Sequence, residues 1–379
     1  MDARLLDEWP VDCAREAILK PEDCMPCKTK IACLIACLAF PAPAFADITI
    51  GSWNLKHLGW NNGKRIDAVA DIAKGADLWA LQEVMDESAV AQLEQELERQ
   101  TGEEWSSMAS HTVGRSSYRE SYAYLWRDSA VEYTQGAVVY LDPGDLFARE
   151  PYLAEFRDKE TGDKIAMAAV HIVYGDNRAD RTPEIRELAS IWEWMREVYP
   201  DSARVIAGDF NLPPSDSAWQ PLRDTGAQPA ITRGATTLSE TDGQYASLYD
   251  NFWYDPAELN VSGIGIVRFP EMLGIDHGSA RDIVSDHAPI YLTTDDAQQQ
   301  FRGVNQIAGE GGQSAEASCI DLDTATPAEL DRLPNVGPAR AQDIIDGRPW
   351  ASVEELTRIS GIGASRAHEI AASGLVCGM

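Results

Sequence analysis

The stretch Arg204-Val-Ile-Ala-Gly-Asp-Phe-Asn211 joins a short apolar run to a carboxylate and an amide. A run of this length and composition predicts a β-strand over 204–209. Asp209 and Asn211 then stand at the end of that strand, where they suit catalysis or metal binding. A plain turn after the strand is the alternative.

Apolar runs and amphipathic stretches alternate throughout 47–294, which predicts a mixed α/β domain. Strands are predicted at 48–55, 78–83, 122–126, 137–141, 165–173, 204–209, 248–254 and 288–293, and helices at 65–74, 88–101 and 183–199. A turn at Glu160-Thr-Gly-Asp163 separates 152–157 from 165–173, so these two runs are expected to form a β-hairpin.

Seven separated segments of this domain place a carboxylate, amide or imidazole at a strand end. They are Ser52-Trp-Asn54, Leu81-Gln-Glu83, Ser117-Tyr-Arg-Glu120, Val170-His171, Gly208-Asp-Phe-Asn211, Tyr249-Asp250 and Ser285-Asp-His287. Each alone is common as a solvated acid or a core histidine. In this order they resemble the endonuclease/exonuclease/phosphatase superfamily, which implies a two-sheet α/β sandwich with the active site at one edge. Segments 114–127 and 147–151 are similar to deoxyribonuclease I, which implies a DNA or RNA phosphodiester substrate.

The resemblance implies a divalent metal site. Glu83, with Asn54 and Asp286, matches the main Mg²⁺ site of the superfamily, and oxygen ligands suit a hard cation such as Mg²⁺, Mn²⁺ or Ca²⁺. Asp209 and Asn211 match positions that orient the nucleophile and contact the phosphate, with a second ion at Asp209 as an option.

Two histidines match the acid/base pair of the superfamily. His171 is expected to pair with Glu120, and His287 with Asp250, because a carboxylate partner fixes the imidazole tautomer and stabilises its protonated form. Which histidine activates water stays open. The remaining histidines match no position of the superfamily and are interpreted as structural; they are His57, His111, His277 and His368.

Tyr118 and Arg149 match deoxyribonuclease I residues that contact the minor groove and its phosphates, and Arg115 adds a possible phosphate contact. Such contacts hold a duplex without reading its sequence. Met85 departs from the pattern, since an arginine that enters the minor groove stands there in the family. Without this arginine, duplex affinity or groove preference is expected to differ. The family's disulfide after Gly-Asp-Phe-Asn is also absent here.

The C-terminal part divides into a predicted flexible linker at 295–318 and a small all-α domain at 319–379. Two glycine turns in this domain, at 333–341 and 359–367, are weakly duplicated and resemble the helix-hairpin-helix domain of bacterial competence DNA receptors. The resemblance implies phosphate binding by backbone amides at Gly337 and, with the better-matching pattern, at Gly361 and Gly363. Because the segment lacks a basic stripe, a protein-docking module is the alternative.

Five of the seven cysteines fall in the first 46 residues, which leaves Cys319 and Cys377. In an oxidising compartment this pair is expected to form a disulfide that closes the C-terminal domain, with two free buried thiols as the alternative.

Residues 1–46 have the features of a signal peptide: a basic patch at Lys28 and Lys30, an apolar run, and Ala44-Phe-Ala46 before the expected cleavage. Because Met25 stands just before this basic patch, residues 1–24 are interpreted as an overextended start. A cytoplasmic extension is the alternative. The chain is therefore expected to be secreted, to the periplasm or the medium. Cleavage before a lipidated Cys37 is a minority alternative, and without it no stable membrane association is expected.

The formal net charge of −29 is unusual for a nucleic-acid enzyme, but screening over about 8 Å in physiological salt leaves local arginines effective. Together these patterns predict a secreted, Mg²⁺-dependent nuclease that cuts DNA, in double-stranded form, with little sequence specificity. RNA is a possible second substrate, and the oligomeric state is open. The alternatives are a phosphatase or phospholipase C of the same fold and a non-catalytic DNA-binding uptake protein.

Overall fold

The computed structural model describes residues 48–295 apart from 61, and a discontinuous part of 297–376. The gaps in the second part are 298–299, 302–304, 308–319, 326–329, 331–332, 334–335 and 373–375. The predicted signal peptide with Cys37, and the predicted disulfide between Cys319 and Cys377, lie outside the described residues.

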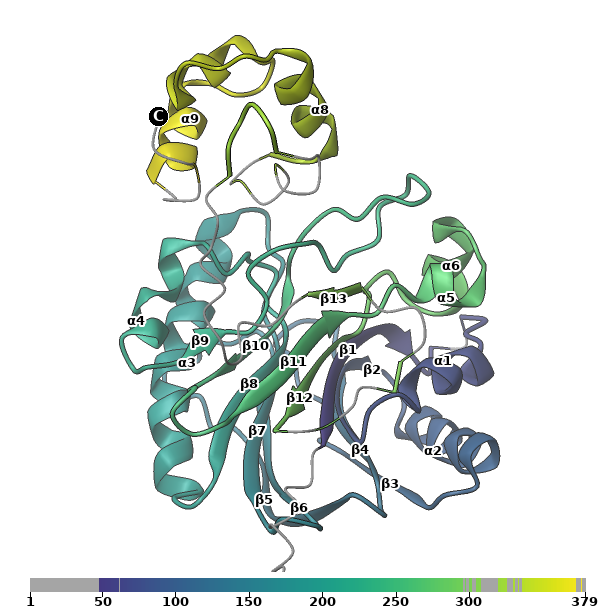
Figure 1. Ribbon diagram of the computed structural model, residues 1–379. Coiled ribbons are helices and arrows are strands. Elements are labelled where there is room, and N and C mark those ends of the chain that lie inside the picture. Colours follow the sequence, from purple (N-terminus) through teal and green to yellow (C-terminus); the bar gives the residue numbers. More distant parts are fainter. Residues whose placement is uncertain are drawn as a thin grey trace, which may run out of the picture. The chain divides into compact units, whose positions relative to one another are not determined.

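Two β-sheets pack face to face, with helices α1 and α2 beside one sheet and α3 and α4 beside the other (Figure 1). One sheet has the strand order β13-β11-β12-β1-β2-β4-β3, and the other has the order β5-β6-β7-β8-β10-β9. The strands are β1 (Thr49–Leu58), β2 (Leu78–Val84), β3 (Trp105–Ala109), β4 (Ser121–Arg127), β5 (Val131–Val139), β6 (Tyr152–Asp158), β7 (Lys164–His171), β8 (Ala203–Asp209), β9 (Gln228–Pro229), β10 (Asp250–Tyr254), β11 (Val261–Ile266), β12 (Ile290–Thr294) and β13 (Asn305–Ile307). The helices of this domain are α1 (Ile66–Ala73), α2 (Glu87–Thr101), α3 (Arg178–Val198), η1 (Ser217–Trp219), α4 (Gln220–Arg223), α5 (Phe269–Leu273) and α6 (His277–Ile283). The predicted two-sheet α/β sandwich is confirmed, and so is the β6–β7 hairpin.

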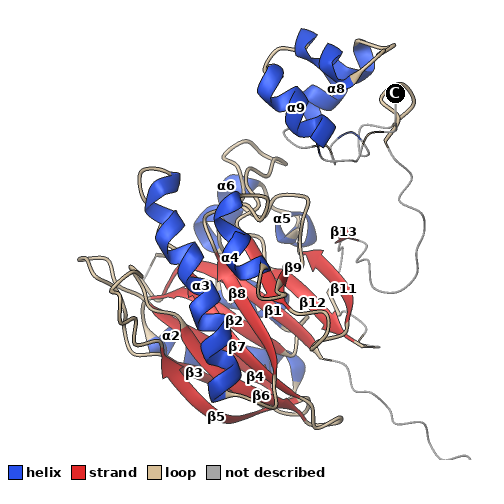
Figure 2. Ribbon diagram, turned by 90° about the vertical axis from the view of Figure 1, so that its left-hand side faces the viewer, coloured by secondary structure: helices blue, strands red, loops and turns tan. Residues whose placement is uncertain are grey.

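Aromatic side chains join the two sheets. Tyr124 of β4 lies in ring contact with Tyr152 and Phe156 of β6, at 5.3 and 5.0 Å. Its hydroxyl lies within hydrogen-bond distance of two backbone carbonyls of the second sheet. Helix α3 lies along the outer face of the second sheet (Figure 2). A second core, in which Trp192 and Ile206 are fully buried, joins α3 to this sheet. Burial on both faces explains why the central strands read as continuous apolar runs.

Some predicted boundaries were wrong. Helix α3 begins at Arg178, because Asn177 and Asp180 form a capping box one and a half turns before Pro183, where the helix was expected to start. Strands β3 and β11 and helices α5 and α6 were not predicted from the sequence, and β5 was predicted at 137–141 but spans 131–139. Strand β5 lies at a sheet edge with alternating exposed residues and two irregularities in its register, so its apolar pattern is weak.

The predicted linker was wrong in its first part. Phe301 is only 7% exposed and packs against Trp79 and Tyr291, at ring distances of 6.1 and 4.9 Å. Residues 305–307 pair with β11 as an edge strand. One aromatic residue in a polar stretch is a weak signal in sequence, but its burial attaches the start of 295–318 to the catalytic domain.

The strand pairing explains why distant polar residues meet. Strands β1 and β2 are parallel, as are β7 and β8, and the second pair sets His171 opposite Asp209. Strand β10 runs antiparallel to β8 and sets Asp250 opposite Asp209 as well. Since carboxyl ends of parallel strands and amino ends of their antiparallel neighbours share one sheet edge, the polar segments converge there.

Gly208 makes the close approach of β7 and β8 possible. Its φ is +153°, and a Cβ atom at this position would lie 1.9 Å from the carbonyl oxygen of Val170. We expect Gly208→Ala to lower the free energy of unfolding by at least about 3 kcal/mol, because both the backbone angle and the collision oppose a side chain. Chemical denaturation followed by circular dichroism measures this change.

Gly162 provides the matched control. It lies in the β6–β7 turn and also has a positive φ, +81°, but a Cβ atom at this position would have no neighbour within 4 Å. Gly162→Ala should cost only about 1 kcal/mol, the ordinary penalty of a left-handed alanine. Equal losses in the two variants would contradict the assigned role of the β7–β8 contact.

The C-terminal domain has its own apolar core, which includes Leu322, Ile344, Leu356 and Ile370. Its described helices are α8 (Pro338–Asp346), η2 (Val353–Arg358) and α9 (Ala364–Ala372). An isolated parallel bridge pairs residue 320 with residue 376, so the neighbours of the two predicted disulfide cysteines lie side by side. Within the described part of the chain, no helix is both long and apolar enough to cross a bilayer.

Candidate active site

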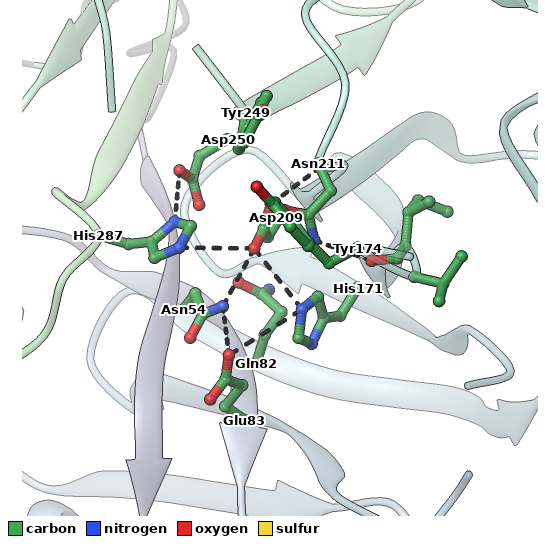
Figure 3. Close-up of polar contacts among 12 residues, drawn as sticks. Asn54, Gln82, Glu83, His171, Tyr174, Asp209, Asn211, Tyr249, Asp250 and His287 are labelled. Carbon is green, nitrogen blue, oxygen red and sulfur yellow. Dashed lines mark hydrogen bonds and ion pairs between the residues drawn. The ribbon is translucent and has the colours of Figure 1, made fainter. Parts of the chain in front are cut away.

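Asp209 lies at the centre of the convergent edge (Figure 3). Its Oδ2 atom is 3.6 Å from Nε2 of His171 and 3.6 Å from Nε2 of His287. The same oxygen accepts a hydrogen bond from the Asn54 amide at 3.2 Å. Asp209 is 2% exposed, so this carboxylate faces two imidazoles and an amide with little solvent to screen it.

Each imidazole is held from behind by a buried carboxylate. Nδ1 of His171 is 2.7 Å from Oε1 of Glu120, and Nδ1 of His287 is 2.8 Å from Oδ2 of Asp250. Since a carboxylate accepts hydrogen bonds, Nδ1 carries the proton in both rings and Nε2 is directed at the centre. The structure thus joins the two predicted pairs in matching geometry on opposite sides of Asp209.

The buried carboxylates raise the pKa of both imidazoles. Burial alone lowers the pKa of His287, but the carboxylates of Asp250 and Asp209 outweigh it and raise the pKa well above the usual value. Burial and the Arg149 guanidinium lower the pKa of His171, and Glu120 and Asp209 raise it by more. Burial opposes ionisation of Glu120, yet His171 and Arg149 hold its pKa below the ordinary range.

Glu83 and Asn54 stand beside this centre. Nδ2 of Asn54 donates to Oε1 of Glu83 at 2.9 Å as well as to Asp209, so the two carboxylates share one amide. Glu83 has a φ of +57°, at an irregularity in the pairing of β1 with β2. Asn211 is also left-handed, with a φ of +50°, and its side chain donates to the carbonyl of Ile172.

These residues fit a divalent cation. Oxygen atoms of Glu83 and Asp209 lie against the same amide, and such closely spaced carboxylates repel each other unless a cation neutralises them. Asp209, Asp250 and His287 also offer one ligand atom each within 4.8 Å of one another. Because a hard cation prefers oxygen ligands to an imidazole nitrogen, Glu83 and Asp209 are the better ligands.

Asp286, the third residue of the expected metal set, forms two ion pairs of its own. Its Oδ2 atom is 3.6 Å from Nζ of Lys56 and 3.7 Å from Nη2 of Arg281. These two cations already balance the Asp286 charge. A direct metal bond from Asp286 therefore needs these ion pairs to open, and its role as a ligand stays a prediction.

Arg149 is mostly buried, with 9% of its surface exposed. Its guanidinium donates to the carbonyl oxygens of His171 and Ile172, and lies 3.8 Å from Glu120. These bonds orient His171, a role that the sequence did not suggest; a DNA contact by Arg149 stays a prediction. Tyr118 is half-buried beneath the Arg149 guanidinium, and Arg115 is exposed, 3.7 Å from Asp145.

His57 belongs to the site, contrary to its interpretation as a structural histidine. Its Nε2 atom is 3.2 Å from Oε2 of Glu83, and its backbone N–H donates to the same oxygen at 3.1 Å. A histidine three positions after Asn54 on the same strand was a usable signal. The left-handed φ of His57, +61°, turns its side chain in a way that strand alternation does not predict.

His277 and His111 do not join the centre. His277 is buried against Tyr245, with a ring distance of 4.9 Å, and His111 is exposed. The side chain of His368 lies outside the described residues.

In the C-terminal domain, Gly361 has a φ of +83° and its carbonyl accepts a bond from Arg366. Gly361 and Gly363 border a shallow depression with Arg358 and Arg366. Gly337 directly precedes α8 in extended conformation, at φ −100° and ψ 179°. Both turns thus lead into a helix N-terminus, with arginines near the second.

Both the catalytic domain and the C-terminal domain match known protein families. The Endonuclease/Exonuclease/phosphatase family matches residues 51–287, and the Helix-hairpin-helix motif matches 316–373. A protein of Thioalkalivibrio sp. (strain K90mix) named Deoxyribonuclease is 46% identical over 353 residues, which cover 91% of this chain and 96% of that protein. Deoxyribonuclease-1-like 2 of Homo sapiens is 27% identical over 293 residues, which cover 69% of this chain and 97% of that protein. The chain therefore belongs to the endonuclease/exonuclease/phosphatase family, as the order of its polar segments predicted.

Proposed function

We propose that this protein is a divalent-metal-dependent deoxyribonuclease that hydrolyses DNA phosphodiester bonds with little regard to sequence. One observation carries the proposal: two carboxylate-bound imidazoles present Nε2 at 3.6 Å from the same oxygen of Asp209. A pair of this kind can remove a proton from one oxygen and supply one to another in a single reaction. The deoxyribonuclease name of the 46% identical relative supports DNA as the substrate.

Hydrolysis requires water to attack phosphorus while one ester P–O bond breaks. One of the two histidines takes the proton of the attacking water, and the other donates a proton to the departing oxygen. The products are a phosphate monoester and a free hydroxyl group. Glu120 and Asp250 stabilise the charged ring on each side, since both carboxylates are almost fully buried.

Glu83 and Asp209 would hold the cation, with Mg²⁺ the preferred ion, and Asn54 would keep the two carboxylates in position. The bound ion would neutralise charge on the non-bridging phosphoryl oxygens. Asn211 lies beside Asp209, its backbone N–H donating to Oδ1 at 3.0 Å. We assign Asn211 to positioning the phosphate.

Purified protein should convert supercoiled plasmid to open-circular and linear forms in the presence of Mg²⁺. Parallel reactions with tRNA and with p-nitrophenyl phosphate separate a deoxyribonuclease from a ribonuclease and from a phosphomonoesterase of the same fold. Hydrolysis of the monoester without cleavage of plasmid would reject the proposed function.

The C-terminal domain is proposed to hold duplex DNA through Gly361, Gly363 and neighbouring arginines, because backbone N–H groups at a helix N-terminus bind phosphate without reading bases. Tethering would raise the local DNA concentration at the active site. We expect a chain that ends after Ile307 to bind duplex about tenfold more weakly in a mobility-shift assay with chelator present. Hydrolysis of bis(p-nitrophenyl) phosphate should not change.

The end point of this truncation matters. A chain that ends at residue 294 would also lose Phe301, which packs against Trp79 and Tyr291, and would be destabilised. If the chain ending after Ile307 binds duplex as tightly as the full chain, the C-terminal domain has another role, such as protein docking.

We propose export on the basis of the pattern in residues 1–46. Mass spectrometry of protein recovered outside the cytoplasm should give an N-terminus at Asp47. A lipid-modified N-terminus at Cys37, or an intact N-terminus in the cytoplasm, would exclude this cleavage.

A further inference from the structure

Three rings pack against one another at the edge of the active site. The indole of Trp60 stacks on the imidazole of His57, with ring centroids 4.3 Å apart and planes 26° apart. The Tyr118 ring meets both of them edge-on, at 5.7 Å from His57 and 6.0 Å from Trp60. These three residues are called the aromatic shelf below.

The aromatic shelf is anchored to the metal-binding carboxylate. His57 contacts Oε2 of Glu83 through its ring, at 3.2 Å, and through its backbone N–H, at 3.1 Å. Glu83 in turn shares the Asn54 amide with Asp209. An unbroken series of contacts therefore runs from the shelf to the centre of the site.

The turn that carries Trp60 is tightly built. The backbone N–H of Trp60 donates to the carbonyl of His57 at 3.2 Å. Gly59 has a φ of +98°, and a Cβ atom there would lie 2.7 Å from Cβ of Asp86. The hydrogen bond from Trp60 to His57 and the left-handed Gly59 thus define the turn that presents the indole.

Trp60 is nevertheless 54% exposed, although it lies beside an acidic site that must receive a charged polymer. A single exposed aromatic residue is common on protein surfaces. Here the ring is also stacked on His57, which itself contacts Glu83, while more than half of the Trp60 surface stays open. That arrangement matches a platform for a flat ligand better than it matches a core residue.

Given the proposed function, we infer that the aromatic shelf stacks a nucleobase of the strand being cut, one that has left its own base pair. Aromatic rings bind all bases in this way, because every base has a π-face. Stacking also needs no positive charge, which suits a protein with a net charge of −29. The shelf would therefore favour single-stranded or locally melted DNA over a closed duplex.

The test compares the wild type with Trp60→Ala, Trp60→Phe and Leu141→Ala. Leu141 is 90% exposed and serves as a control for the loss of an exposed apolar side chain. For each protein, kcat/KM is measured on a single-stranded oligonucleotide and on the same sequence as a duplex, and each value is divided by kcat/KM for bis(p-nitrophenyl) phosphate. Thermal unfolding checks that all variants are folded.

The single-strand ratio and the duplex ratio are kcat/KM on each DNA substrate divided by kcat/KM for bis(p-nitrophenyl) phosphate. We expect Trp60→Ala to lower the single-strand ratio about tenfold or more and the duplex ratio by much less. Trp60→Phe should restore most of the loss, and Leu141→Ala should match the wild type. An unchanged single-strand ratio would overturn the inference. Equal losses on both substrates would also overturn it, in favour of a groove contact.

A binding measurement separates this inference from the proposed function. A single-stranded oligonucleotide with 2-aminopurine is titrated with protein in the presence of chelator, so that no cleavage occurs. Stacking on the shelf should quench the 2-aminopurine fluorescence with wild type and with Trp60→Phe, but not with Trp60→Ala. If the wild type quenches but never cuts DNA, the proposed function fails; if it cuts but the Trp60→Ala variant quenches equally, the aromatic shelf fails.

Discussion

Replacing His287 by alanine is expected to lower kcat for plasmid cleavage by about three orders of magnitude, within the range that positioned acid/base groups contribute. The Nε2 atom of His287 is one of two that face Asp209, and no other described imidazole takes that position. Quantified plasmid nicking over time at saturating Mg²⁺ measures the loss.

The same experiment tests whether the two histidines act as a unit. Because both proton transfers belong to one reaction, removing His171 as well should cost less than another tenfold. If the activity losses of the two single variants multiply in the double variant, the histidines do not act as a unit. His111→Ala, at an exposed histidine, is the control and should retain full activity.

Loss of fold is a competing explanation for His287→Ala, because Asp250 would remain buried without its partner. His287→Gln provides a side-chain amide that can still donate to Asp250, but it cannot exchange protons near neutral pH. If thermal unfolding of His287→Gln matches the wild type and its activity is equally low, the loss belongs to the chemistry.

Glu83→Gln is expected to lower kcat/KM about 100-fold at 1 mM Mg²⁺, with partial recovery as Mg²⁺ is raised. The amide keeps the size of the side chain but removes the negative charge that a hard cation needs. The wild type should lose all measurable activity with excess EDTA and regain it when Mg²⁺ is added back. A Mg²⁺ titration of both proteins gives the comparison.

Glu87→Gln is the matched control, since Glu87 is an exposed carboxylate four positions along the chain, at the start of α2. Its Mg²⁺ dependence should equal that of the wild type. Activity in EDTA, or a Glu83→Gln variant whose Mg²⁺ dependence is unchanged, would remove Glu83 from the metal site. Asp286→Asn in the same titration decides whether the Lys56 and Arg281 ion pairs open to admit a cation.

The sequence by itself determined the family, the two-sheet sandwich and most of the residues that meet at the site. This was possible because each polar segment follows or precedes an apolar run, and such local patterns predict strands and their ends. It also located Glu120 and Asp250, although only through resemblance, because each lies far along the chain from its histidine.

Only the tertiary structure decided how these residues face one another. The register of β7 with β8 places His171 opposite Asp209, and both imidazoles then share one carboxylate oxygen. Tertiary packing also pairs Asp286 with Lys56 and Arg281, and it buries the Arg149 side chain. It places Trp60 in contact with His57 and Tyr118. The physical reason is that three features depend on residues distant in the chain: strand register, left-handed backbone at an irregularity, and side-chain packing. Apolar periodicity, by contrast, depends only on residues that are close together in the sequence.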